Sequence, residues 1–270
     1  MKMFRALMNK KIVKTSKSAV AIFVILRISI IICALIEAVH GNIINVLLCV
    51  AALILYTIPT FVQEKLKFEF PNTFETIIYF FIFSSVVLGE INKFYIMIPH
   101  WDTILHLLSG FLCAGFGFSL FELCNKKKTV RDVTLVFTVI VSFCFSMTVG
   151  VLWEVVEYAA DNVLRVDMQK GTIVRDIASI ELNPVKDNSS LKIDDIVETN
   201  IKTVNGKEII VNGYLDIGLN DTMKDLIMDM FGASIFCVFG VFYVLNKDKP
   251  KKRFKFASLF IPKTDSESNL

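Results

Sequence analysis

The stretch 132-DVTLVFTVIVSFCFSMTVGVLWEVVEYAADNV-163 carries the clearest evidence for the class of this protein. It consists of a run of about twenty mostly apolar residues followed by three carboxylates, Glu154, Glu157 and Asp161. About 20 apolar residues span a bilayer as a helix, so the run predicts a membrane span that tilts or projects beyond the membrane. The spacing i, i+3, i+7 places the carboxylates on one narrow stripe of that helix.

The composition of the whole chain also indicates a membrane protein. Of its 270 residues 54% are hydrophobic, 24 are Phe, and the mean hydropathy is +0.59, which is more apolar surface than one globular core can hide. We predict an all-α integral membrane protein, a bundle of six transmembrane helices. The predicted spans are roughly 18–39, 43–62, 73–90, 102–124, 132–160 and 222–245.

The first span has a competing interpretation as a cleaved signal peptide. Its apolar run is longer than the hydrophobic region of a usual signal peptide, and Arg27 interrupts it, so we expect it to be retained. The Arg27 side chain either reaches the cytoplasmic headgroups or pairs within the bundle.

The orientation follows from the basic segments. Lys and Arg are concentrated in 1–17, in 125-NKKKTVRD-132 and in 246-NKDKPKKRFKF-256, and such segments stay in the cytoplasm. Six spans place both termini on one side, so we predict N and C termini in the cytoplasm. The net charge of +3 is then mainly a topology signal, and we expect no nucleic-acid partner.

This topology defines the organisation of the chain. The predicted parts are a basic cytoplasmic N-terminus over 1–17, transmembrane helices 1–5 over 18–160, an extracytoplasmic insertion over 161–221, transmembrane helix 6 over 222–245, and a basic, partly disordered cytoplasmic tail over 246–270.

The insertion contains short strand patterns. In 201-IKTVNGKEIIVNGYLDI-217 two Asn-Gly pairs flank KEIIV, which predicts a small β-hairpin or meander between helices 5 and 6. The insertion is too short to bury a large core, so we expect it to lean on the helix ends. The six cysteines lie in or beside apolar segments without a CxxC spacing, which predicts no disulfide framework and no thiolate metal site.

Acidic residues and histidine gather at the predicted outer ends of three helices. In 100-HWDTILHLLSGF-111, Asp102 and His106 are four residues apart and share a helix face. In 220-NDTMKDLIMDMFGA-233, Asp221, Asp225 and Asp229 are also spaced by four. With Glu154 and Glu157 on helix 5, these side chains fall on the same side of the membrane.

Such a group is costly in a membrane. One charge at the bilayer centre costs about 2.5–3.5 kcal/mol on insertion scales, and neighbouring acids repel one another. Lys224 is the obvious cation within the cluster's own helices. We therefore expect a shared polar cavity at the outer face, with a divalent metal ion as its candidate cofactor. Two members have alternatives, because Asp221 also suits a helix N-cap and Asp161 also suits a membrane–water boundary.

These motifs resemble a known family. The runs IPHWDTILHLLSGF, LWEVVEYAADNVLRVDMQKG and GLNDTMKDLIMDMFGA are similar to YjdF-like bacterial inner-membrane proteins and, more distantly, to VanZ-like membrane proteins. The resemblance covers about 75–245 and implies a multi-pass protein of the bacterial inner membrane. It adds Gln169 to the site residues. The VanZ-like proteins are linked to glycopeptide-antibiotic resistance, and the long segment 170–218 departs from the family's shorter connection.

The favoured function is a metal-dependent hydrolase or transferase acting on a lipid or a lipid-linked envelope substrate. Carboxylate and imidazole ligands suit Mg²⁺, Mn²⁺, Zn²⁺ or Fe, and the motifs GxSxG and HExxH are absent. The predicted catalytic residues are His106, Glu154, Glu157 and Asp225. The predicted metal ligands are Asp102, His106, Glu154, Glu157, Asp221, Asp225 and Asp229. The predicted substrate contacts are Gln169, Lys224 and Tyr158, of which Tyr158 also suits an aromatic belt.

Two other function classes stay open. Clustered acids relay protons or ions in transporters, but such a pathway needs polar groups in the inner half of the bundle, where we find mainly Arg27, Thr138, Ser142 and Ser146. The third class is a binding or scaffold protein that works through the external insertion.

Overall fold

The computed structural model describes residues 17–66, 68–124, 131–185, 187–246 and 263–264. The basic segments that carry the predicted orientation, 1–17, 125–132 and 246–270, lie almost wholly outside these residues. The described residues divide into two compact units, one formed by those within 1–150 and 227–270 and the other by those within 151–226. Helices α8 and α9 each continue without interruption from one unit into the other.

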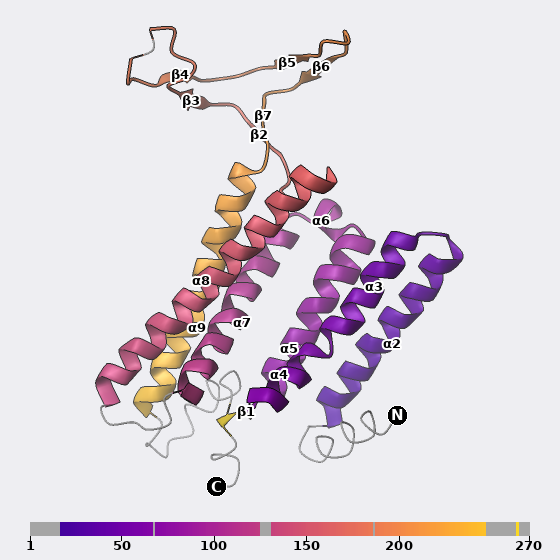
Figure 1. The fold of residues 1–270 in the computed structure, drawn as a ribbon, viewed down its shortest axis with the longest axis vertical. Coiled ribbons are helices and arrows are strands. Elements are labelled where there is room, and N and C mark those ends of the chain that lie inside the picture. Colours follow the sequence, from indigo (N-terminus) through magenta and orange to yellow (C-terminus); the bar gives the residue numbers. More distant parts are fainter. Residues whose placement is uncertain (1–16, 67, 125–130, 186, 247–262, 265–270) are drawn as a thin grey trace. The chain divides into compact units, whose positions relative to one another are not determined.

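The described residues contain six stretches that are long and apolar enough to cross a membrane, which confirms the predicted number of spans. Figure 1 shows the helices in sequence colours. They are α2 (Lys17–Val39), α3 with α4 (Ile43–Leu55, Ile58–Leu66), α5 with η1 (Asn72–Phe83, Ser84–Ile91), α7 (Trp101–Cys124), α8 (Arg131–Leu164) and α9 (Leu219–Asn246). At 1.5 Å per residue, the 34 residues of α8 extend about 51 Å, which exceeds the ~30 Å hydrocarbon layer.

The second span is broken between α3 and α4. The backbone tightens there, because the Thr57 amide donates to the Ile54 carbonyl at 2.9 Å, one residue short of the α-helical spacing. Pro59 follows in the first turn of α4, where a residue without an N–H is tolerated. The break leaves Tyr56 buried, and its hydroxyl donates to the Tyr79 carbonyl at 2.7 Å, so the bend is tied to α5.

The third span ends as a π-helix, η1, rather than as an α-helix. The Asn92 amide donates to the Val87 carbonyl at 3.0 Å, five residues back. Lys93, with φ 59°, reverses the chain into the short helix α6 (Phe94–Met97). Tyr95 from this reversal contacts η1 through a hydrogen bond between its hydroxyl and that of Ser85, 3.2 Å apart.

Two hydrophobic clusters fill the interior of the first unit. One joins α2, α3, α5 and η1 around Ile30, Ala52 and Tyr79. The other joins α5, α7 and α9 around Phe74, Phe118 and Phe236. Many other apolar side chains of the spanning helices are exposed, as a lipid-facing surface requires.

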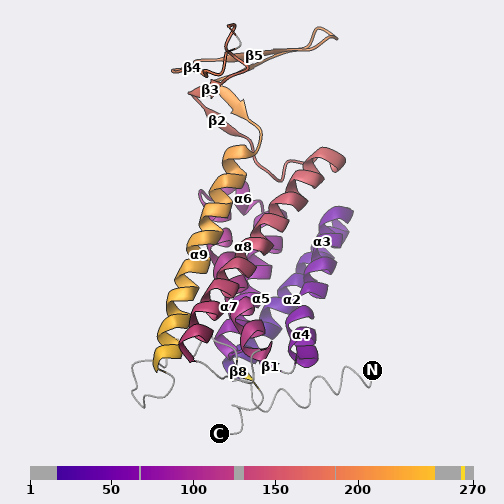
Figure 2. The ribbon, with the colours of Figure 1, turned by 60° about the vertical axis from the view of Figure 1, so that its left-hand side comes forward.

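Helices α7, α8 and α9 run side by side in both views of the ribbon (Figures 1 and 2). Small residues bring their backbones together. A Cβ atom at Gly110 would lie 2.1 Å from the Asp229 carbonyl oxygen, and one at Gly232 would lie 2.0 Å from the Leu107 carbonyl oxygen. The Ser146 hydroxyl of α8 donates to the Gly110 carbonyl at 2.8 Å. Gly110 and Gly232 therefore allow α7 and α9 to pack closely.

The described residues between the end of α8 and the start of α9 form six short strands. They form three two-stranded antiparallel pairs. The pairs are β2 (Thr172–Val174) with β7 (Tyr214–Asp216), β3 (Ile177–Ser179) with β4 (Leu191–Ile193), and β5 (Thr199–Lys202) with β6 (Glu208–Val211). A further pair, β1 (Phe68–Glu69) with β8 (Lys263–Thr264), belongs to the first unit.

The predicted hairpin is β5–β6. Its turn contains the first Asn-Gly pair, with Gly206 at φ 78°, and the Thr203 amide donates to the Lys207 carbonyl at 2.9 Å. The second pair does not form a hairpin turn. Gly213, at φ 115°, instead leads the chain from β6 into β7, which pairs with the distant β2.

Candidate metal-binding site

The first two site residues lie at the start of α7. His100, with φ 62°, turns the chain into the helix, so Asp102 lies in the first turn, where a negative charge is favourable. His106 follows one turn later and is 7% exposed. Its Nε2 lies 3.7 Å from Asp102 Oδ1, which is too far for a hydrogen bond.

Helix α9 brings two further carboxylates. Asp225 and Asp229 are one turn apart and are each 1% exposed. Asp229 Oδ2 lies 3.3 Å from His106 Nδ1, and the close approach of the helices at Gly110 and Gly232 makes this contact possible. The His106 ring therefore has a carboxylate near each of its two nitrogen atoms.

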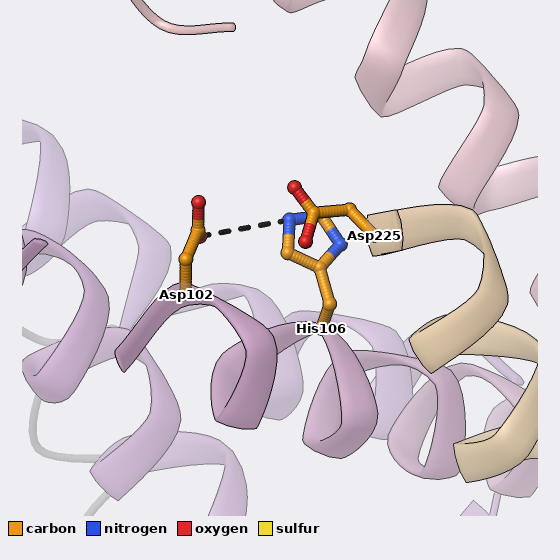
Figure 3. A group of neighbouring side chains, drawn as sticks. All are labelled: Asp102, His106 and Asp225. Carbon is orange, nitrogen blue, oxygen red and sulfur yellow. Dashed lines mark ion pairs between the residues drawn. The ribbon is translucent and has the colours of Figure 1, made fainter. Parts of the chain in front are cut away.

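Asp102, His106 and Asp225 meet a geometric condition for a metal site. Each offers one ligand atom, and these atoms lie within 4.8 Å of one another. Figure 3 shows the three side chains directed toward one another from α7 and α9. Two ligands that are each about 2.1 Å from a tetrahedral ion are about 3.4 Å apart, which is close to the Asp102–His106 spacing.

The electrostatics also favour a cation. Asp225, Asp229 and Glu154 are all buried in a protein that crosses a membrane. Buried carboxylates must be paired, protonated or bound to metal, since an isolated buried charge is too costly. One imidazole and two carboxylates suit Zn²⁺, Mn²⁺ or Fe²⁺, and the carboxylates alone suit Mg²⁺.

The predicted carboxylates of α8 lie on its last turns. Glu154 is 5% exposed and lies one turn beyond Gly150, whereas Glu157 is half-buried. Neither belongs to the group of three ligand atoms within 4.8 Å. Their predicted roles as ligands or catalytic groups stay predictions.

Asp161 and Asp221 both bind the segment that leads from α8 into the strand region. The Asp161 carboxylate accepts hydrogen bonds from the amides of Met168 at 2.6 Å and Gln169 at 2.8 Å. The Asp221 carboxylate accepts one from the Lys170 amide at 3.0 Å. Asp221 lies within the first turn of α9, which begins at Leu219, so it is not the N-cap.

Gln169 is fixed by several contacts. Its side-chain amide donates to the Thr222 hydroxyl at 2.6 Å, and Gly218, at φ 92°, leaves room for it, because a Cβ there would lie 2.8 Å from the Gln169 Cβ. Lys224 and Tyr158, the other predicted substrate contacts, are exposed. The substrate role of all three stays a prediction.

Gly150 and Thr222 were not predicted to lie near the site. Thr222 lies between Asp221 and Asp225 but belongs to no motif that would predict its contact with Gln169. Gly150 could have been found, because Ser146, Gly150 and Glu154 recur every four residues and so share one face of α8.

Comparison with known proteins places the chain in a family. A family model described as "Predicted membrane protein (DUF2238)" matches residues 19–246. The chain belongs to this family. The match covers all six spans and the strand region, and the description assigns no reaction.

One relative is an uncharacterised protein of Thermotoga maritima, 30% identical over 105 residues, which are 38% of this chain. The matched region spans about half of that relative, 53% of its length. No solved structure matches the chain. These findings are consistent with the YjdF-like resemblance, while the VanZ-like resemblance stays a prediction.

Proposed function

We propose that this protein is a metal-dependent hydrolase or transferase of the bacterial inner membrane, acting on a lipid or a lipid-linked envelope substrate. The observation that supports it best is the convergence of Asp102, His106 and Asp225, whose ligand atoms lie within 4.8 Å of one another. A divalent cation held there would polarise a phosphoryl or acyl oxygen and lower the pKa of a bound water.

The chain's own residues then have distinct tasks. Asp102, His106 and Asp225 bind the ion. Glu154, buried on the neighbouring helix α8, is the proposed general base, because a buried carboxylate outside the ligand group can accept a proton from water. A site on membrane-spanning helices suits an amphiphilic substrate whose apolar part stays in lipid.

Metal analysis of the purified protein tests this proposal. Wild-type protein in detergent should hold close to one Zn²⁺, Mn²⁺ or Fe per chain by elemental analysis, or bind one of these or Mg²⁺ in equilibrium dialysis. His106→Gln should lose most of that metal. Asp194→Asn, an exposed aspartate of the strand region, is the matched control and should keep it. A wild-type protein that neither carries nor binds metal would contradict the proposal.

Ion or proton transport is the alternative that one observation favours. Thr138, Ser142 and Ser146 are buried along one face of α8, four residues apart. However, the Ser142 hydroxyl donates to the Thr138 carbonyl at 2.6 Å and the Ser146 hydroxyl to the Gly110 carbonyl. The Ser142 and Ser146 hydroxyls thus donate to backbone carbonyls, so we place transport second. Ion flux in proteoliposomes that Asp225→Asn abolishes would reverse this order.

A further inference from the structure

The His106 ring makes different contacts through its two nitrogen atoms. Nδ1 lies 3.3 Å from Asp229 Oδ2, just beyond the usual length of a hydrogen bond, whereas Nε2 lies 3.7 Å from Asp102 Oδ1. An ionised carboxylate only accepts hydrogen bonds, so a hydrogen bond to Asp229 requires the proton on Nδ1. Nε2 then keeps its lone pair on the side of Asp102.

We infer that Asp229 is a positioning residue and not a metal ligand. Its carboxylate accepts the Nδ1–H of His106, fixes the tautomer and the ring orientation, and so presents Nε2 to the divalent cation of the proposed function, on which this inference rests. The ligand atoms that lie within 4.8 Å of one another come from Asp102, His106 and Asp225 and do not include Asp229.

The packing around Asp229 holds its carboxylate in place. Asp229 is 1% exposed, and its backbone carbonyl lies against Gly110 of α7, where any Cβ would come within 2.1 Å. Its Oδ2 lies against Gly150 of α8, where a Cβ would come within 2.6 Å. The absence of two side chains, on two different helices, therefore creates the space for this residue.

A carboxylate behind a metal-binding histidine has a measurable effect. It orients the ring and raises the basicity of the ligating nitrogen, and losing it typically weakens metal binding about 10–100-fold. A carboxylate with a purely structural role would change stability without selectively changing metal affinity.

Gly150→Ala should displace the Asp229 carboxylate without removing it, so it tests whether the position of this group matters. The new Cβ would meet Asp229 Oδ2, the end of a side chain, so we expect the carboxylate to move while the helices keep their places. Gly240→Ala on α9 is the matched control, because its Cβ would meet the Phe118 ring at 3.1 Å and the Phe236 ring at 3.9 Å. Asp229→Ala removes the acceptor, and Asp229→Asn keeps one oxygen that can accept.

The first readout needs no metal. In metal-free protein labelled with ¹⁵N-histidine, at a pH where the ¹⁵N shifts report a neutral His106 ring, His106 should be protonated on Nδ1. Asp229→Ala and Gly150→Ala should shift it toward the Nε2-protonated form, and Gly240→Ala should not. An Nε2-protonated His106 in the wild type would overturn the inference whatever the metal result.

The second readout is the dissociation constant for Zn²⁺ or Mn²⁺ in equilibrium dialysis. We expect about a 10–100-fold weakening in Asp229→Ala and Gly150→Ala, a smaller one in Asp229→Asn, and none in Gly240→Ala. Unchanged affinity in the first two variants would overturn the inference. A wild type that has the Nδ1-protonated tautomer but binds no metal would overturn the proposed function and still support the assignment of Asp229.

Discussion

At the scale of single residues, four buried or partly buried side chains surround the candidate metal site. His106 contacts Asp229 through one nitrogen and faces Asp102 with the other, and Asp225 completes the candidate ligand group. Three acids around one imidazole leave a net negative charge unless protons or a cation balance it. This imbalance is the physical reason for expecting a tightly bound cation.

Asp225→Asn tests that balance. The amide has nearly the shape of the carboxylate but no charge, so metal-free protein should unfold at the same or a higher temperature. Saturating metal at 100 times its dissociation constant stabilises a folded wild type by about 2.7 kcal/mol, and the variant should lose this gain. Thermal unfolding in detergent with and without Zn²⁺ or Mn²⁺ measures both quantities. An equal metal-induced shift in both proteins would exclude Asp225 as a ligand.

The sequence predicted that Asp225 and Asp229 lie near His106, but it did not distinguish their positions. The sequence does not distinguish Asp225 from Asp229, since each follows the preceding aspartate by four residues and both lie on one face of a helix. Tertiary packing separates them, because Gly110 and Gly150 place Asp229 behind the His106 ring. The His106–Asp229 contact joins residues 123 positions apart, so the four-residue spacing within each helix does not predict it.

At the scale of helices and strands, the approach of α7 to α9 decides whether the site exists. A Cβ at Gly232 would lie 2.0 Å from the Leu107 carbonyl oxygen, and backbone atoms cannot move aside as a side-chain end can. The two helices must therefore separate if either contact glycine gains a side chain.

We expect Gly232→Ala to destabilise the protein by about 1–3 kcal/mol, the usual cost of overpacking. It should also weaken metal binding, because His106 and Asp229 lie on the two helices that separate. Gly240→Ala should have the smaller effect on stability and none on metal binding. Unfolding in detergent and equilibrium dialysis provide the two measurements, and equal behaviour of the two variants would contradict the packing argument.

The loop between β3 and β4 has its own pH dependence. The Ser189 hydroxyl, followed by the Ser189 backbone amide, lowers the pKa of Asp187 below its ordinary 3.8, and the Asn183 amide adds to this. The folded-state pKa is depressed, so this contribution to loop stability is present above about pH 3.8 and is lost as pH falls through the lowered pKa.

Ser189→Ala should raise the pKa of Asp187 toward 3.8, because it removes the largest of these effects. A ¹³C NMR titration of the side-chain carboxyl measures the change. Ser190→Ala, at the neighbouring exposed serine, should leave the pKa where it is in the wild type. If Ser189→Ala also leaves the pKa unchanged, the loop geometry is wrong.

The sequence predicted the elements that depend on local residues but not those that depend on distant contacts. The six spans follow from local apolar content, and the β5–β6 hairpin follows from its Asn-Gly turn. The break at Thr57 and the π-helix depend on neighbours such as Tyr79 and Tyr95. The β2–β7 pair joins residues about 40 positions apart, which no local pattern specifies.

At the scale of the whole molecule, six spans divide the chain between two sides of the membrane. Successive spans alternate in direction, so the end of α4 and the strand region must lie on opposite sides. The distribution of Lys and Arg predicts that the strand region is outside the cytoplasm. On this prediction Asp102, in the first turn of α7, and Asp225, in the second turn of α9, lie at the outward ends of their helices.

Labelling of introduced cysteines tests this orientation. In a variant without the six native cysteines, Val204→Cys at the fully exposed β5–β6 turn should react with a membrane-impermeant maleimide in intact spheroplasts. Glu64→Cys, exposed near the end of α4, should react only after the membrane is permeabilised. The opposite pattern would place the acidic ends of α7 and α9 at the cytoplasmic face. The proposed substrate would then have to be a lipid intermediate of the inner leaflet, because a site at that face cannot reach an envelope precursor that has already crossed the membrane.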